Sequence, residues 1–324
     1  MTAPALAGRA DEEGSRFYTW GEEQYWSVTT IIGRGMPKHL APWAAKLVAE
    51  LAWEDMKARP HGRNAASLRR WARNGRAYVE ALQAAGGLTS VKLERLTPEE
   101  LGLRWLKGEP DRVRDAAADR GRDVHAEAED LVLAEAETLI AYAAGGGDLG
   151  TALERDWPES FAAWMRSFGN FVEDWRPEFL AAEATVFNTA QAYAGTLDAI
   201  AVIPRLDDAL PGLGLGEVPL VIDYKSGNRL YPEVAIQLSA YARGEFVGLP
   251  DGVTEAPLPE VSPEYGLALH LRPATRQHPR GYRLRPVRIG QDVFAHFLFA
   301  RENFRWVTET SKAVLLDELA LEVA

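Results

Sequence analysis

The spacing of hydrophobic residues along the chain changes near residue 177. From about residue 38 to residue 176, alanine and leucine alternate with charged residues at helical spacing. Four breaks that contain glycine or proline divide this stretch into about five helices. From residue 179 onward, short runs of β-branched and aromatic residues are separated by turn residues, which is typical of strands. The chain therefore predicts a helical first part and a sheet-forming second part.

The second part predicts a sheet with helices between and after its strands. Pro232 suits the first turn of the helix that follows the third strand. We expect strands over 179–188, 193–203 and 218–225, a helix over 231–246, strands over 265–273 and 281–289, a helix over 290–319, and an earlier hairpin over 17–32. This order predicts an α/β fold with a central mixed β-sheet flanked by helices, plus a helical N-terminal region.

The same pattern suggests how the chain divides. Residues 1–15 are expected to be disordered, 16–176 to hold the hairpin and the helical region, and 177–324 to form the core. The two larger parts are expected to make one composite domain. The glycine-rich stretch 212–218 leads into a strand and not into a helix, so we interpret it as a loop and not as a pyrophosphate-binding turn.

Composition narrows the chemistry that is available. The 324 residues include ten tryptophans and are 47% hydrophobic, which is enough for a sizeable core. No run of 18 apolar residues occurs and the opening lacks a signal-peptide pattern, so we expect a soluble, cytoplasmic protein with no membrane partner. The absence of cysteine excludes disulfides, thiolate zinc sites and cysteine-ligated iron–sulfur clusters. Any metal must be held by histidine, carboxylates or carbonyls, which favours Mg²⁺ or Mn²⁺.

Charge is distributed unevenly along the chain. The net charge of −11 argues weakly against a nucleic-acid partner. Basic residues nevertheless gather in two runs, which could contact phosphates or could simply be solvated faces. The runs comprise Lys57, Arg59, Arg63, Arg69, Arg70, Arg73 and Arg76, and then Arg272, Arg276, Arg280, Arg283, Arg285 and Arg288.

Two neighbouring strands end in charged residues. Asp198 lies in the strand that contains "GTLD", and Asp223 and Lys225 lie two apart in "VIDYKSG". Residues i and i+2 of a strand share one face, so Asp223 and Lys225 point the same way. If the strands are neighbours, two carboxylates and an ammonium share one small volume. Such a group suits metal-dependent phosphodiester cleavage, whereas the simpler interpretation is an Asp–Lys ion pair at a strand end.

Two helices carry further polar candidates. His125 lies on a helix in "DRGRDVHAEAEDL", where it is the natural additional ligand for a site built from aspartates. Gln237 and Tyr241 are four apart in "PEVAIQLSAYA" and so share one face of the helix after Lys225.

In this order, these residues resemble the PD-(D/E)xK nuclease superfamily, and within it the RecB-type exonuclease branch. That branch places a histidine on a helix, then G-x-x-D, then (D/E)-x-K, then Q-x-x-x-Y. The chain supplies His125, "GTLD", "DYK" and "QLSAY" in the same sequence. The resemblance covers about residues 120 to 245 and extends loosely to 289. It implies a restriction-endonuclease-like core.

The resemblance also implies roles for individual residues. His125, Asp198, Asp223 and the backbone carbonyl of Tyr224 would bind Mg²⁺ or Mn²⁺, and Lys225 would be catalytic together with the two aspartates. Gln237 and Tyr241 would support the site or contact DNA. Glu183, on the preceding strand, is a weaker candidate for a supporting role or for a second metal.

The function implied is that of a metal-dependent deoxyribonuclease. It would be an exonuclease of phage DNA recombination, repair or processing that acts on linear or single-stranded ends, alone or with a recombination partner protein, in the host cytoplasm. The chain departs from many members of the branch because it lacks the four cysteines of their iron–sulfur cluster. The alternatives are a catalytically silent DNA-binding or assembly protein on a nuclease scaffold, a nuclease active only in a complex, and an RNA nuclease.

Overall fold

The computed structural model describes residues 10–12, 15–36, 45–52, 63–86, 88, 91–134, 158–159, 161–249 and 251–316. These residues form two compact units. The first contains the described residues up to residue 37 and from Arg120 onward, and the second contains those from residue 38 to residue 119. The boundary expected between residues 176 and 177 falls inside the first unit, because the N-terminal hairpin and the helix before residue 176 both pack with the sheet.

The second unit is helical. It contains α3 (Arg63–Ala84), the short 3-10 helix η1 (Leu93–Arg95), α4 (Pro98–Lys107) and the beginning of α5 (Glu109–Ala134), which continues into the first unit. Thr97 and Glu100 form a capping box at the start of α4, each side chain bonded to the other residue's backbone N–H. Gly75 of α3 lies against the backbone of Leu101, which lets α3 and α4 pack closely.

The first unit is built on a ten-stranded mixed sheet within the described residues. The strand pairs β3–β5 and β6–β9 are parallel and the remaining pairs are antiparallel. The strands are β1 (Ala10–Glu12), β2 (Ser15–Trp20), β3 (Glu23–Ser27), β4 (Glu178–Asn188), β5 (Tyr193–Val202), β6 (Leu220–Lys225), β7 (Phe246–Gly248), β8 (Glu255–Pro257), β9 (Tyr265–Leu271) and β10 (Tyr282–Arg288).

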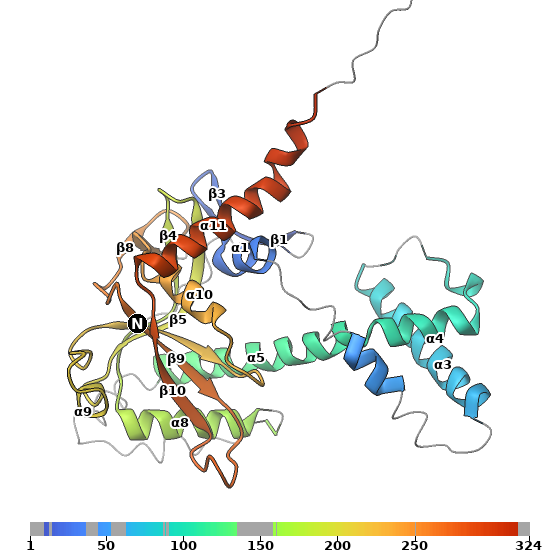
Figure 1. The fold of residues 1–324 in the computed structure, drawn as a ribbon, viewed down its shortest axis with the longest axis horizontal. Helices are drawn as coiled ribbons and strands as arrows, with labels where there is room; N and C mark the ends of the chain where they lie inside the picture. Colours follow the sequence, from blue (N-terminus) through green and yellow to red (C-terminus); the bar gives the residue numbers. More distant parts are fainter. Residues whose placement is uncertain are drawn as a thin grey trace, which may run out of the picture. The chain divides into compact units, whose positions relative to one another are not determined.

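Helices cover both faces of this sheet, so the expected α/β class with a mixed, helix-flanked sheet is confirmed (Figure 1). On one face, Val124 and Ala128 of α5 pack with the phenylalanines of α8 (Ala162–Trp175). On the other face lie α1 (Val28–Gly35), α10 (Glu233–Tyr241) and α11 (Gln291–Thr308). Two short helices, α9 (Leu206–Ala209) and η2 (Thr310–Ala313), complete the described elements of this unit.

Most expected strands form, and the differences are local. The stretch expected as a hairpin over 17–32 turns into α1 at Val28, because the Ser27 side chain accepts the Thr30 N–H and caps a helix. Ala10–Glu12, inside the stretch expected to be disordered, form β1; residues 1–9 and 13–14 lie outside the described residues. The pattern did not predict β7, β8 or α9, which are only three or four residues long.

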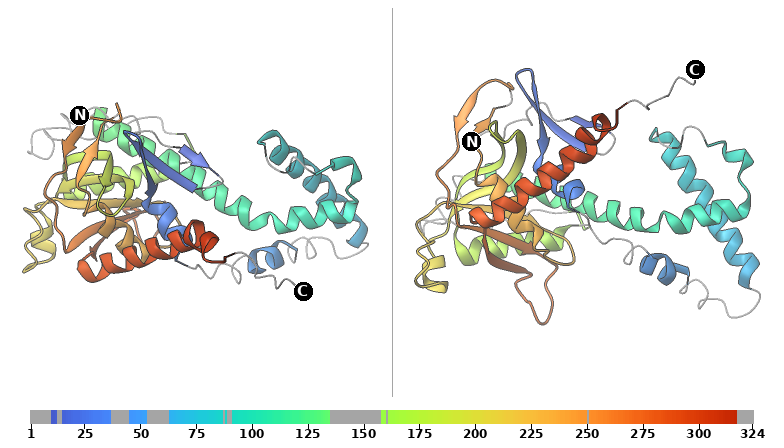
Figure 2. Two further views of the ribbon diagram at one scale, coloured as in Figure 1. Left: turned by 90° about the horizontal axis from the view of Figure 1, so that it is seen from above. Right: turned by 45° about the horizontal axis from the view of Figure 1, so that its top comes forward.

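The N-terminal and C-terminal segments meet on one face of the sheet. Figure 2 shows α1 beside α11, and Gly35 approaches Ala300 so closely that a Cβ on residue 35 would meet the Ala300 carbonyl. Asn303 Nδ2 donates a hydrogen bond of 3.3 Å to the Gly35 carbonyl. No helix among the described residues is long and apolar enough to cross a membrane.

Pairing along β5 is interrupted at one edge. On one side, β4 pairs with β5 along almost its whole length. On the other side, Tyr193 and Ala194 pair with β3, and residues 199–201 pair with β6. Residues 195–198, the "GTLD" stretch, therefore have no strand partner on that edge among the described strands. This interruption is where the candidate site lies.

Candidate metal centre

Asp198 lies where β6 separates from β5. The last paired residues are Ala199 and Ile222, and one residue further along β5 the Asp198 carboxylate accepts the backbone N–H of Tyr224 through Oδ2. A side chain thus takes the place of the missing strand partner and satisfies a buried donor. Only 10% of the Asp198 side chain is exposed, so its position is set by packing and by this hydrogen bond.

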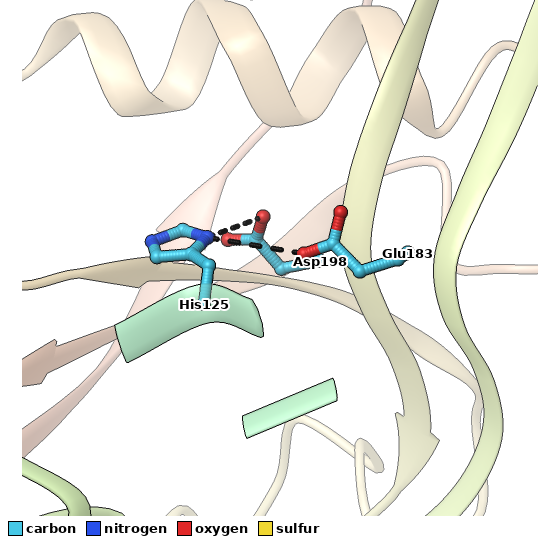
Figure 3. A group of neighbouring side chains, drawn as sticks. All are labelled: His125, Glu183 and Asp198. Carbon is cyan, nitrogen blue, oxygen red and sulfur yellow. Dashed lines mark hydrogen bonds and ion pairs between the residues drawn. The ribbon is translucent and has the colours of Figure 1, made fainter. Parts of the chain in front are cut away.

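Two further ligand-type side chains reach the same carboxylate. Nδ1 of His125, on α5, lies 3.1 Å from Asp198 Oδ1 and 4.0 Å from Glu183 Oε1 (Figure 3). One ligand atom from each of His125, Glu183 and Asp198 falls within 4.8 Å of the others. The histidine comes from a helix and the two acids come from neighbouring strands, so the group forms only in the folded chain. It could hold a metal ion.

Glu183 occupies a strained backbone position. Its φ of +44° lies in the left-handed region, which costs a non-glycine residue about 1–2 kcal/mol. The strand switches faces at this point: Ala182 packs with the cluster under α5 and α8, whereas Ala184 packs with the cluster under α10 and α11. Strained residues inside strands cluster at functional sites. The switch directs the Glu183 carboxylate toward Asp198, which lies opposite it on β5.

This geometry predicts that two substitutions of Glu183 weaken metal binding alike but differ in their effect on stability. Glu183→Gly and Glu183→Ala both remove the carboxylate, so both should weaken Mn²⁺ binding. The glycine variant should nevertheless be more stable than the alanine variant by about 1 kcal/mol, because only glycine adopts positive φ without strain. Urea unfolding beside a Mn²⁺ titration measures both effects. Equal stability of the two variants would show that residue 183 carries no backbone strain.

Asp223 and Lys225 form a close ion pair on the other side of Asp198. As the strand period predicts, they share a face: Lys225 Nζ lies 2.7 Å from Asp223 Oδ1 and 2.6 Å from Oδ2. Hydrogen-bond geometry is met only at Oδ1, so Oδ2 is buried without a hydrogen-bond partner among the described residues. The Asp223 side chain is 1% exposed and that of Lys225 is 33% exposed.

Mutual electrostatics set the protonation of the group. Burial alone would lower the pKa of His125, but the carboxylates of Asp198 and Glu183 outweigh it and raise this pKa to about 9. Burial raises the pKa of Asp223 to about 6, with Asp198 adding to the effect and the Lys225 ammonium opposing it. Burial would also lower the pKa of Lys225, yet Asp223 and Asp198 raise it. At neutral pH without a metal, the side chains of His125 and Lys225 are therefore both protonated, and a bound metal would displace the His125 proton.

Two side chains of helix α10 form a hydrogen-bonded chain with Lys225. Gln237 Oε1 accepts a 3.3 Å hydrogen bond from Lys225 Nζ, and Gln237 Nε2 donates one of 3.1 Å to the Tyr241 hydroxyl. The Tyr241 ring in turn covers Gly195, the first residue of "GTLD". The glutamine and the tyrosine thus link the two strand motifs, which explains why a polar pair occurs on an otherwise apolar helix.

Gly195→Ala should disrupt this link. A Cβ at residue 195 would lie 2.7 Å from Tyr241 Cε1 and 3.2 Å from Val28 Cγ2. Overpacking of this kind costs about 1–3 kcal/mol, and here it would push Tyr241 away from Gln237. The matched control is Gly33→Ala on α1, where a Cβ meets nothing within 4 Å. Urea unfolding should show loss of stability for the first variant and a small gain for the second; a neutral Gly195→Ala would contradict this packing.

The structure brings together most of the site residues expected from the sequence. His125 and Asp198 are in contact, and Lys225, Gln237 and Tyr241 form one hydrogen-bonded chain. Asp223, expected as a further ligand, forms an ion pair with Lys225 beside this group. The backbone carbonyl of Tyr224 was also expected as a ligand. The backbone N–H of this residue donates a hydrogen bond to Asp198.

Glu183, the weakest of the sequence candidates, joins His125 and Asp198 in the three-residue group. One feature of the sequence could have made Glu183 a stronger candidate. The strands expected over 179–188 and 193–203 are joined by four residues, and a short hairpin with Asn188 opposite Tyr193 sets residue 183 opposite residue 198.

No protein-family model matches the chain, and no curated protein matches it. The fold and the geometry of the site therefore carry the functional argument.

Proposed function

We propose that the chain is a metal-dependent nuclease that hydrolyses phosphodiester bonds in DNA. The observation that carries this proposal is the position of Asp198. It contacts His125 through one oxygen and the Tyr224 N–H through the other, next to the Asp223–Lys225 pair. An ion pair that merely capped a strand end would need neither the histidine nor the strained glutamate. The order of these residues also resembles that of the RecB-type nucleases.

The side chains fit a divalent cation with mixed nitrogen and oxygen ligands. His125, Glu183 and Asp198 would hold it, and Oδ2 of Asp223, 2.6 Å from the Lys225 ammonium, is a further carboxylate oxygen on the adjacent strand. Carboxylates suit both Mg²⁺ and Mn²⁺, whereas the imidazole favours Mn²⁺ over Mg²⁺. When bound, the ion would lower the pKa of a coordinated water and offset negative charge on the phosphate.

Lys225 would act as a fixed cation. The acids around it raise its pKa, so its amine is protonated at neutral pH and is a poor base. A protonated amine beside the phosphate stabilises the negative charge that develops on its oxygens in the transition state. Gln237 would hold the ammonium in place through its 3.3 Å hydrogen bond, and Asp223 would keep it charged.

The resemblance further supports an exonuclease that acts on linear DNA. The test is a cleavage assay on end-labelled single-stranded and double-stranded linear DNA beside a closed circle, with Mn²⁺, Mg²⁺ or EDTA. We expect metal-dependent loss of the linear DNA, spared circles, and faster cleavage with Mn²⁺ than with Mg²⁺. Binding of DNA without cleavage under any metal would instead indicate the silent binding protein, and cleavage of circles would indicate an endonuclease.

A further inference from the structure

Basic residues continue from Lys225 across the sheet. In the parallel pair β6–β9, Lys225 lies opposite His270 and Asp223 lies opposite Ala268. In the antiparallel pair β9–β10, His270 lies opposite Arg283 and Ala268 lies opposite Arg285. Residues directly opposite one another on paired strands share a face. The register therefore places Arg283 and Arg285 on the same face of the sheet as Lys225, two strands away.

These two arginines are exposed and have no acidic partner among the described residues. Within the described residues, Arg283 forms a side-chain hydrogen bond only with the His278 ring nitrogen, and Arg285 forms no ion pair. Three other arginines of this basic run have partners, and of these Arg272 donates a hydrogen bond to the Asn228 carbonyl. Arg280 pairs with Asp174 and Glu173 and holds the loop after β9 to α8, whereas Arg288 pairs with Asp292. Arg283 and Arg285 thus remain available to an external anion.

His270 fills the space between Lys225 and Arg283 without adding negative charge. Its Nε2 lies 2.8 Å from the Gly227 carbonyl, and 6% of the residue is exposed. Burial lowers the pKa of His270, and Arg272, Arg283 and Arg285 lower it further. The charged side chains that lower this pKa are all arginines, two of them on β10.

The row is open at its far end. β10 pairs with β9 alone among the described strands, and Pro286 lacks the N–H that another strand would need. Neighbouring strands lie about 4.8 Å apart, so the row from β6 to β10 spans about 10 Å.

We propose that one strand of DNA runs along this row, with the phosphodiester to be cleaved beside Lys225 and the phosphates that follow it bound by Arg285 and Arg283. This inference rests on the proposed nuclease function, because it places the phosphodiester to be cleaved at the metal centre. Contacts of this kind are made to the backbone and carry no base information, as suits cleavage without sequence preference.

The test measures binding and cleavage separately. The full chain and the variants Arg283→Gln, Arg285→Gln and the double substitution are titrated with a fluorescent single-stranded DNA in EDTA, at salt concentrations from 0.05 to about 0.3 M. Each lost phosphate contact should reduce the slope of log affinity against log salt by about 0.7, and hence by about 1.4 for the double variant. At about 0.1 M salt, binding should weaken about fivefold for each single variant and about 25-fold for the double variant. Arg288→Gln is the control, since it removes one charge from the same strand at a residue paired with Asp292.

The outcomes distinguish the proposed DNA path from the proposed nuclease activity. Row variants that reduce the salt slope in a chain that never cleaves DNA would support the binding path and overturn the nuclease. A chain that cleaves DNA while all three row variants bind like the Arg288→Gln control would support the nuclease and overturn the path. Loss of affinity for single-stranded RNA but not for DNA would overturn DNA as the occupant.

Discussion

Lys225→Ala is expected to reduce the rate of DNA cleavage by at least about 10²–10³-fold while the fold persists. The ammonium lies 2.6–2.7 Å from both oxygens of Asp223 and is held by Gln237, so it is a preorganised cation at the site. Removing one such electrostatic donor typically causes a loss of this size. Metal binding should change much less, because His125, Glu183 and Asp198 remain.

The fold should survive because Asp223 can take up a proton. A buried carboxylate that loses its partner costs about 3–5 kcal/mol if it stays charged. The pKa of Asp223 already stands at about 6 with Lys225 present, and without the ammonium it rises further, so at neutral pH the carboxyl becomes neutral. Thermal unfolding of Lys225→Ala should therefore show a modest decrease in Tm.

Lys225→Arg distinguishes the two possible roles of the lysine. Arginine stays protonated under all assay conditions, so it can replace a fixed cation in part but cannot act as a base. Single-turnover cleavage rates of wild type, Lys225→Arg and Lys225→Ala measure the difference. Activity that is partly retained with arginine supports charge stabilisation. Equal loss in both variants would contradict that role, and unchanged activity in Lys225→Ala would remove this lysine from the mechanism.

Asp198→Asn is expected to weaken Mn²⁺ binding at least about 100-fold and to abolish cleavage. The amide oxygen of the new side chain can still accept the Tyr224 N–H, so this buried donor keeps its hydrogen bond where β5 and β6 separate. What is lost is the negative charge that faces His125 and contributes a ligand to the group. This effect exceeds that of Glu183→Ala, because Asp198 is closer to His125 and more deeply buried.

Asp208→Asn provides the matched control for this substitution. Asp208 is an exposed acid on α9, in the same unit, and the same single charge is removed there. Calorimetric Mn²⁺ titration should show wild-type affinity for Asp208→Asn and little or no binding heat for Asp198→Asn. If both variants bind Mn²⁺ as tightly as wild type, the metal lies elsewhere in the chain.

Local chemistry made part of this site predictable from the sequence. Asp223 and Lys225 share a face because the strand period is two, and Gln237 and Tyr241 share one because the helix repeat is 3.6 residues. Both relations hold whatever the rest of the fold does. The ion pair and the hydrogen-bonded chain therefore follow directly from spacing.

Contacts between distant elements were not predictable in the same way. The position of His125 depends on how α5 packs across the sheet, and no local pattern records that packing. The interruption between β3 and β6 depends on which strands share the edge of β5. The place of Glu183 in the group depends on its left-handed backbone within β4, where periodicity predicts a regular strand.

The most direct test of this account compares metal binding with catalysis in one titration. Mn²⁺ is added to the apo chain, bound metal is followed by electron paramagnetic resonance, and cleavage of end-labelled linear DNA is measured at each concentration. We predict that the cleavage rate rises with the occupancy of one Mn²⁺ site, and that Asp198→Asn loses both signals. Cleavage that persists in EDTA, or a fully occupied site without cleavage, would contradict the account.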